Sequence, residues 1–189
     1  MKSAIPYATT PKTTTSSTSS SSDEELILNP IIDLSGWQLP QDIDYDVLSN
    51  HISGAIVRVF GGSLISKDSN AASSNGVDKS FKTHIKELKK RDVPVAVYSY
   101  AQGTSVKEMK EEARIFYKNA SPYKPTYYWI DVEEETMSNM EQGVQAFLAE
   151  LKRLGAENVG LYIGAYFMLE QEVSTKNFDA VWIPAYGTD

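Results

Sequence analysis

The sequence predicts an α/β fold built on a parallel sheet. Six short apolar runs are typical of buried strands, at residues 31–34, 55–59, 93–98, 127–132, 159–163 and 180–183. Segments with the spacing of amphipathic helices separate most of these runs. Continuous apolar strands suit a parallel sheet that is covered on both faces, and alternation with helices indicates right-handed crossovers. Six strands are compatible with an open doubly wound sheet or with a barrel.

Two helices are expected between the first three strands, at residues 44–53 and 78–90. The second is amphipathic, because its apolar side chains recur at helical spacing and form one stripe, made by Phe81, Ile85 and Leu88. His51 and His84 fall on these two helices without the spacing of metal ligands. We therefore expect both histidines to be solvated side chains on helix surfaces.

Capping boxes mark the next two helices. Ser105 is followed three residues later by Glu108, a spacing that lets each side chain bond the backbone N–H of the other residue. Ser138 and Glu141 repeat this spacing before the fourth helix. Gly155 follows the last apolar position of that helix and is the expected C-terminal stop.

The N-terminal part of the chain differs in composition from the rest. An unbroken Ser/Thr run at residues 13–22 is followed by three acidic residues, so this part cannot bury enough apolar surface to offset the entropy of ordering. We expect residues 1–28 to be a disordered linker and residues 29–189 to form one folded domain. The N-terminus lacks the basic start and apolar middle of a signal peptide.

Bulk composition excludes several classes of function. The net charge of −7 argues against a nucleic-acid binder, which needs a surplus of Lys and Arg. The chain has no cysteine, which excludes disulfides, thiolate zinc sites and thiol catalysis. Its sequence contains neither an 18-residue apolar run nor a glycine-rich phosphate loop nor a G-x-S-x-G elbow. Acid–base chemistry is therefore left to carboxylates, without a metal or organic cofactor.

An acid pair ends the fourth predicted strand, in the run Tyr-Tyr-Trp-Ile-Asp-Val-Glu at residues 127–133. Side chains at i and i+2 share one face of a strand, so Asp131 and Glu133 point the same way, with α-carbons ~6.5–7 Å apart. Two acids at this range perturb each other, and the more buried one holds its proton while the other stays ionised. Glycoside hydrolysis needs such a pair.

Other polar and aromatic side chains fall at or near the ends of the predicted strands, where the sites of parallel α/β folds gather. They are Asp33, Tyr98, Tyr162, Trp182 and Tyr186. Acids and aromatics together at one rim are typical of a sugar-binding groove. Taken singly, Asp33 has a simpler interpretation as a turn or helix cap, and the aromatics as packing residues. A solvated acidic turn is the corresponding alternative for residues 133–135.

The ordered series of motifs resembles glycoside hydrolase family 25, the Chalaropsis-type lysozymes. The matching pieces are residues 31–38 (IIDLSGWQ), 55–59 (AIVRV), Asp78-x-x-Phe81, 93–98 (VPVAVY), 129–133 (WIDVE), 158–164 (NVGLYIG) and 182–186 (WIPAY). Singly, a D-x-E motif is weak. The series is specific because it keeps its order and covers nearly everything from residue 31 onward.

The resemblance implies a TIM-like flattened (β/α) barrel, incomplete at its C-terminal end because family members continue with two more strands and a further active-site Asp. It also implies a secreted enzyme, acting outside the cell or in the cell wall as a monomer. That enzyme hydrolyses the β-1,4 bond between N-acetylmuramic acid and N-acetylglucosamine in bacterial peptidoglycan. Glu133 matches the family's general acid, and Asp131 and Asp33 match the flanking carboxylates. The groove residues implied are Arg58, Tyr98, Tyr162 and Trp182.

The expected mechanism places the proton on Glu133. Partial burial beside Trp129 and the tyrosines is expected to keep Glu133 protonated, while Asp131 or Asp33 stays ionised and stabilises an oxazolinium-like intermediate. Two alternatives stay open. The chain is a non-catalytic module that binds peptidoglycan, or a chitinase-like barrel, although chitinases carry a longer acidic run than this sequence offers.

Overall fold

A computed structural model of the chain describes residues 29–61, 71–73 and 75–185. The expected linker at residues 1–28 therefore lies outside the described residues, as does Tyr186. Within the described part, no helix is both long and apolar enough to cross a membrane.

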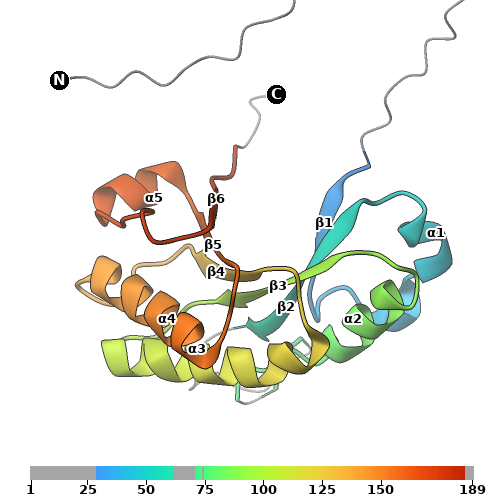
Figure 1. Cartoon of the computed structure of the whole chain (residues 1–189), viewed down its shortest axis with the longest axis horizontal. Helices are drawn as coiled ribbons and strands as arrows, with labels where there is room; N and C mark the ends of the chain where they lie inside the picture. Colours follow the sequence, from blue (N-terminus) through green and yellow to red (C-terminus); the bar gives the residue numbers. More distant parts are fainter. Residues whose placement is uncertain (1–28, 62–70, 74, 186–189) are drawn as a thin grey trace, which may run out of the picture.

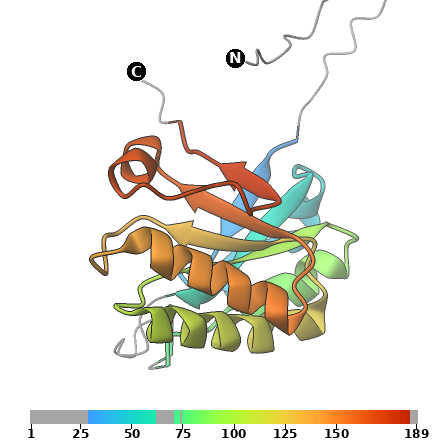
Figure 2. The same ribbon diagram turned by 60° about the vertical axis from the view of Figure 1, so that its left-hand side comes forward.

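Six parallel strands form one sheet in the order of the sequence. They are β1 (Ile31–Leu34), β2 (Gly54–Gly61), β3 (Val95–Tyr100), β4 (Tyr128–Val132), β5 (Val159–Ile163) and β6 (Ala180–Trp182). Because each strand lies beside its sequence neighbour, the winding never reverses, and the sheet curls as in a barrel instead of opening as a doubly wound sheet. Figures 1 and 2 show this curl. The predicted incomplete TIM-like barrel is confirmed.

The connecting helices cover the outer face of the curled sheet (Figure 1). They are α1 (Tyr45–Ser49), α2 (Phe81–Lys89), α3 (Val106–Ala120), α4 (Met140–Leu154) and α5 (Ala165–Glu170), with short 3-10 turns η1 (Pro40–Asp42) and η2 (Ser121–Tyr123). α3 and α4 pack against each other beneath β3, β4 and β5. The short α5 is an element that the sequence pattern did not predict.

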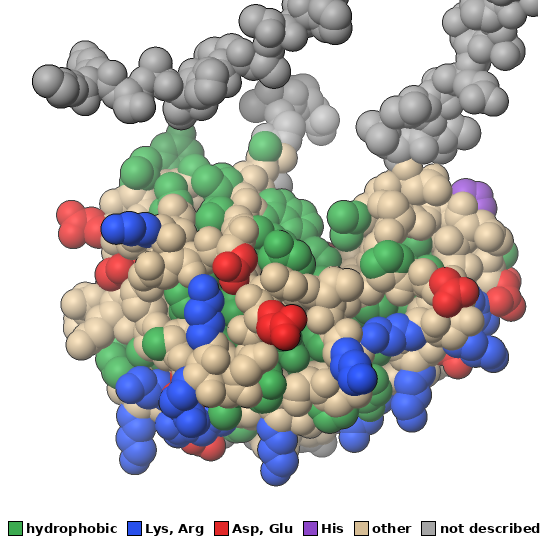
Figure 3. Space-filling model, viewed as in Figure 1, with side chains coloured by type: hydrophobic (Ala, Val, Ile, Leu, Met, Phe, Trp, Pro, Cys, Tyr) green, Lys and Arg blue, Asp and Glu red, His purple; other side chains and the backbone are tan. Residues whose placement is uncertain are grey.

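The core fills the layer between sheet and helices. Its largest fully buried side chains come from both layers, among them Phe60, Phe81, Phe116, Ile130, Phe147, Leu151 and Leu161. Each such side chain contributes about 1.5–3 kcal/mol through burial. On the surface, basic side chains gather along the helical layer, whereas hydrophobic ones gather near α5 and β6 (Figure 3).

The helix ends follow the predicted signals with two shifts. The Ser105 side chain accepts a hydrogen bond from the backbone N–H of Glu108, but the Glu108 carboxylate accepts from the N–H of Thr104 and not from that of Ser105, so only half of the capping box forms. At α4 the cap is Asn139 and not Ser138, because the Asn139 side chain is the one that accepts a bond from the helix backbone. Gly155 ends α4 with φ 105°, a conformation that favours glycine.

The prediction for His84 is wrong. His51 is exposed, as expected. His84, however, is 0% exposed, and its ring extends from α2 to contact α1 and the residues after β1. The reason is visible in the stripe of α2. Position 84 stands three residues after Phe81 and four before Leu88, so it lies on the same helix face as the apolar residues.

Candidate active site

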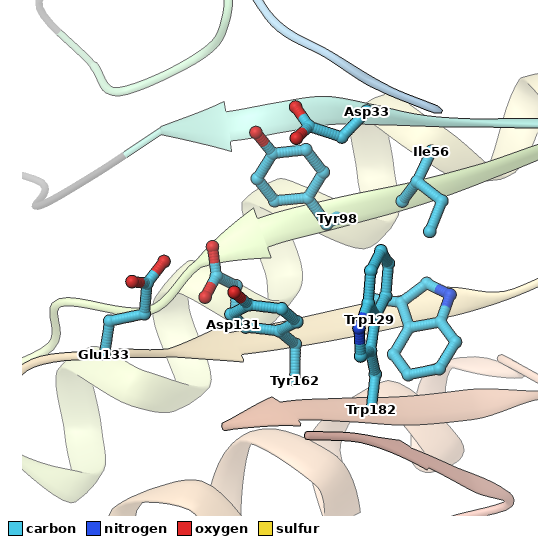
Figure 4. A pocket seen from close by; sticks show the side chains of 8 residues that line it. All are labelled: Asp33, Ile56, Tyr98, Trp129, Asp131, Glu133, Tyr162 and Trp182. Carbon is cyan, nitrogen blue, oxygen red and sulfur yellow. The ribbon is translucent and has the colours of Figure 1, made fainter. Parts of the chain in front are cut away.

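A cleft lies over the inner face of the sheet, toward the carboxyl ends of the strands, with a volume of about 170 Å³. This volume is below the ~300–1,000 Å³ of pockets that enclose a whole ligand, so the cleft is suited to part of a longer chain. Its lining side chains come from β1 to β6 and the residue after β4 (Figure 4). They are Asp33, Ile56, Tyr98, Trp129, Asp131, Glu133, Tyr162 and Trp182.

The alternation of β4 places its polar side chains in this cleft. Trp129, Asp131 and Glu133 line it together, whereas Ile130 and Val132 are fully buried in the core beneath the sheet. The predicted common face of the acid pair is therefore confirmed. The carboxyl groups of both acids reach the same part of the cleft (Figure 4).

Asp131 is the buried member of the pair. Its side chain is 8% exposed, and its Oδ1 atom has no hydrogen-bond partner among the described residues. Burial raises the pKa of Asp131 to about 8, and the charges of Glu133 and Asp33 add to the rise. The charge of Arg58 opposes it. Asp131 therefore holds a proton at neutral pH.

The expectation that Glu133 is the desolvated acid is wrong for this structure. β4 ends at Val132, so Glu133 lies one residue beyond the strand and its side chain is exposed. Of the two acids, Asp131 is the one whose pKa burial raises.

Asp33 and Tyr98 form the opposite wall of the cleft. The Asp33 carboxyl from β1 points toward the Tyr98 hydroxyl from β3 (Figure 4). Burial raises the pKa of Tyr98 well above its usual value, and the charge of Asp33 raises it further. Asp33 also raises the pKa of Asp131. The structure thus brings the three predicted carboxyls, Asp33, Asp131 and Glu133, to one cleft.

An aromatic wall closes the other end of the cleft. The Trp182 ring meets Trp129 edge-on at 6.1 Å between centroids and Tyr162 edge-on at 5.3 Å. Gly160 on β5 makes room for Trp129, because a Cβ atom there would lie 2.5 Å from the indole Cε3. Aromatic faces exposed in this way can stack on the apolar faces of sugar rings.

The loop after β4 is tied to the loop after β3. The Gln102 side chain donates to the Glu134 carboxylate at 3.1 Å, and the Thr136 hydroxyl donates to the Gly103 carbonyl at 2.8 Å. Residues 133–135 are exposed, as a solvated turn would be, but Glu133 differs from its neighbours because it also lines the cleft. These contacts fix the loop that carries it.

Arg58 does not line the cleft but forms an ion pair beside it. Its Nε atom pairs with Asp78 at 3.0 Å, and its charge reaches Asp131 and Tyr98. The sequence analysis expected Trp129 beside Glu133 but named neither Trp129 nor Ile56 as a residue of the groove. The strand alternation that puts Asp131 and Glu133 on the cleft face also puts Trp129 there, so the sequence contained the signal for Trp129.

Within the described ranges, no group of three potential ligands could hold a metal ion.

The arrangement suits acid–base work on an acetal. It offers a buried acid with a raised pKa, further carboxyl groups on two sides of a cleft, and an aromatic surface that can hold a sugar. A protonated acid can deliver a proton to a leaving oxygen, and a carboxylate can stabilise the positive charge that develops on the sugar.

Comparison with known proteins identifies the family of this chain. A model of the family "Glycosyl hydrolases family 25" matches residues 32–189. Among solved structures, the chain is similar to GHIP, a glycosyl hydrolase 25 of Streptococcus pneumoniae, with 57% identity and a TM-score of 0.82. That match covers 85% of this chain and 70% of GHIP. No curated protein sequence matches the chain.

More distant structures share the fold. The catalytic domain of the endolysin ply40 from bacteriophage P40 of Listeria monocytogenes is 22% identical, with a TM-score of 0.64, over 76% of this chain and 68% of that one. The modular Cpl-1 endolysin, solved with a peptidoglycan analogue, is 17% identical, with a TM-score of 0.62, over 83% of this chain and 44% of that one.

Proposed function

The chain belongs to the glycosyl hydrolases of family 25, and we propose that this glycoside hydrolase cleaves the β-1,4 bond between N-acetylmuramic acid and N-acetylglucosamine in bacterial peptidoglycan. Its place of action would be the cell wall or the extracellular space. Residues 29–189 would form the catalytic domain, acting as a monomer, and residues 1–28 a linker before it. Membership of a family with cell-wall lytic members supports peptidoglycan as the substrate.

The observation that carries the proposal is the arrangement of the cleft, in which buried Asp131 and exposed Glu133 lie side by side, with Asp33 on the opposite wall. Burial and the nearby charges of Glu133 and Asp33 raise the pKa of Asp131, so we place a proton on this acid in the free protein. A glycan chain lying over the cleft would remove water from Glu133 and so disfavour its anion. The proton then passes from Asp131 to the neighbouring Glu133 carboxyl. Glu133 becomes the acid, and Asp131 becomes the anion that faces the reacting sugar.

Bond cleavage follows from this proton shift. Glu133 donates the proton to the glycosidic oxygen as the bond from that oxygen to the anomeric carbon breaks. The carbonyl oxygen of the substrate's N-acetyl group forms the new bond to the anomeric carbon, with Asp131 or Asp33 stabilising the resulting positive charge. Glu133, now a carboxylate, removes a proton from the attacking water and so regains its proton. The water oxygen forms a bond to the anomeric carbon as the bond from that carbon to the N-acetyl oxygen breaks, which restores the N-acetyl group.

The remaining side chains of the cleft would bind the glycan. Trp182 meets Trp129 at the end of the cleft away from Glu133, where a sugar face can stack, and Tyr162 extends this aromatic wall toward Asp131. Tyr98 lies beside Asp33 and would contact the reacting sugar. Arg58 would act on the site through its charge. We keep Tyr186, which lies outside the described residues, as a further candidate for substrate binding.

The test is a Glu133→Gln variant assayed on purified peptidoglycan. Because general acid catalysis contributes about 10²–10⁴-fold, the release of new reducing ends should fall by at least that factor. Glu135→Gln is the matched control, since Glu135 is also an exposed acid of the same loop but bonds Gln171 instead of lining the cleft. Its rate should stay near that of the parent.

Two outcomes would contradict the proposal. If Glu133→Gln releases reducing ends as fast as the parent, Glu133 is not the acid. If the parent is retained by insoluble peptidoglycan but releases no reducing ends, the chain is a binding module. A parent that cleaves chitin oligosaccharides but leaves peptidoglycan intact would favour the chitinase-like alternative.

A further inference from the structure

Asp33 stands on a weakly supported strand. β1 has four residues and, among the described residues, pairs only with β2, where Asp33 lies opposite Ile56. A short strand with a neighbour on one side is prone to fray at its end. The end of β1 nevertheless has to hold the Asp33 carboxyl at a fixed place in the cleft, so its support must come from elsewhere.

Two buried polar side chains hold the backbone immediately after Asp33. The Gly36 N–H donates to Asp78 Oδ2 at 2.7 Å, and His84 Nε2 donates to the Ser35 carbonyl at 3.1 Å. Asp78 and His84, which we call the clamp, lie more than 40 positions later in the chain, near the start of α2 and within it. Gly36 also packs closely against the Ala71 backbone, since a Cβ atom at position 36 would lie 2.2 Å from the Ala71 carbonyl oxygen.

The clamp uses the hydrogen-bonding capacity of both side chains. Asp78 is 2% exposed and accepts from Arg58 Nε at 3.0 Å through Oδ2 and from the Ser80 N–H at 2.8 Å through Oδ1. A buried carboxylate is costly unless it is paired in this way. Through Arg58, the same network reaches toward Asp131, whose pKa the Arg58 charge lowers.

His84 is fixed in one tautomer. The Ser35 carbonyl can only accept a hydrogen bond, so Nε2 of His84 carries the hydrogen and Nδ1 accepts from the Tyr45 hydroxyl at 2.6 Å. Burial lowers the pKa of His84, which keeps the ring neutral. The result is a chain of bonds from α1 through α2 to the end of β1.

We propose that Asp78 and His84 are positioning residues, which hold the end of β1 and thereby keep the Asp33 carboxyl in the cleft. The inference rests on the proposed function for its kinetic consequence, but not for its structural one. Neither side chain lines the cleft. Both act through the backbone at Ser35 and Gly36, two and three residues after Asp33.

The kinetic test compares three histidine variants on purified peptidoglycan. His84→Leu removes both bonds and should lower kcat by about 10²-fold, the cost of a misplacement of ~1 Å, with a smaller effect on KM. His84→Gln should restore most of the rate, because its amide can donate to Ser35 and accept from Tyr45. His51→Leu is the matched control and should keep the parent rate, since His51 is exposed and remote from the clamp.

Repeating the comparison in the Asp33→Asn variant separates a positioning role of His84 from a general effect on stability. In Asp33→Asn, the group that the clamp positions has lost its charge, so adding His84→Leu should cost little further rate. If the losses in rate of Asp33→Asn and His84→Leu simply multiply in the double variant, the inference is overturned. Asp78→Asn keeps the shape of the side chain but replaces one accepting oxygen with an NH2 donor, so it can no longer accept from both the Gly36 N–H and the Ser80 N–H. It provides a second probe if His84→Leu does not fold, as judged by circular dichroism.

A measurement without substrate keeps the inference separate from the proposed function. NMR of the free protein, with ¹³C-labelled Asp, follows the carboxyl signals of Asp33 and Asp131. His84→Leu and Asp78→Asn should shift the Asp33 signal and lower the pKa of Asp131, because the Asp33 charge moves away. His84→Gln should change neither. Unchanged signals in all three variants would refute the clamp, even if the parent proved unable to cleave peptidoglycan.

Discussion

The buried proton of Asp131 makes a prediction about stability. We consider Asp131→Asn, which replaces the protonated carboxyl with an uncharged amide of the same shape. The amide has nearly the size and shape of the carboxyl but cannot ionise. The substitution therefore removes the pH-dependent charge with little change in volume.

The sign of the effect follows from the direction of the pKa shift. The pKa of Asp131 rises from 3.8 in the unfolded chain to about 8 in the folded protein. Below 4 both states are protonated and the group costs nothing. Between these values the unfolded chain loses the proton while the folded protein keeps it, so the free energy of unfolding falls as pH rises. Above 8 the full cost is present.

The magnitude is large enough to measure. The parent should lose about 1.4 kcal/mol of stability per pH unit through this group, or about 3 kcal/mol between pH 5 and pH 7. Asp131→Asn lacks this loss, so it should match the parent near pH 4 and exceed it increasingly at higher pH. The gain in stability should accompany a loss of hydrolysis, since the variant cannot share a proton with Glu133.

Urea unfolding at fixed ionic strength, at pH 5, 6 and 7, provides the assay. The midpoint difference between Asp131→Asn and the parent should widen at each step. Glu135→Gln serves as the control and should keep the pH dependence of the parent, because Glu135 is exposed. If Asp131→Asn and the parent show the same slope, Asp131 is ionised in the folded protein, and the argument for a shared proton fails.

Variants at three further positions test the cleft and the helical layer. Trp182→Ala should raise KM on peptidoglycan about 10-fold through lost stacking, whereas Trp182→Phe should keep most of the binding; equal KM values in both would contradict an aromatic wall. Gly160→Ala should displace Trp129, since its Cβ would lie 2.5 Å from that ring, and should raise KM while the circular dichroism spectrum stays unchanged. The Arg153 guanidinium beside Glu150 holds the pKa of Glu150 at about 2, so Glu150→Gln should lower stability by about 1 kcal/mol at pH 7 with unchanged hydrolysis. That difference should shrink as the pH falls from 4.5 toward 2, and a constant difference would rule out the ion pair as its source.

Much of the scaffold could be predicted from the sequence, because the signals are local. Apolar runs located all six strands to within two residues at most of their ends, although β3 begins at Val95 and not at Val93. The two-residue period of a strand put Asp131 and Glu133 on one face, and the position of Gly155 marked the end of α4. These features depend on neighbours a few positions away, which the sequence states directly.

Tertiary structure decided the matters that depend on distant residues. From the sequence we expected Glu133 to be the desolvated acid, and the structure buries Asp131 instead, because burial depends on where β4 ends relative to the cleft walls supplied by β1, β3, β5 and β6. His84 is buried for the same kind of reason, since its partners come from α1 and from the end of β1. Protonation follows from solvent exclusion and surrounding charge, and both are properties of the folded assembly, not of the neighbouring residues in the chain.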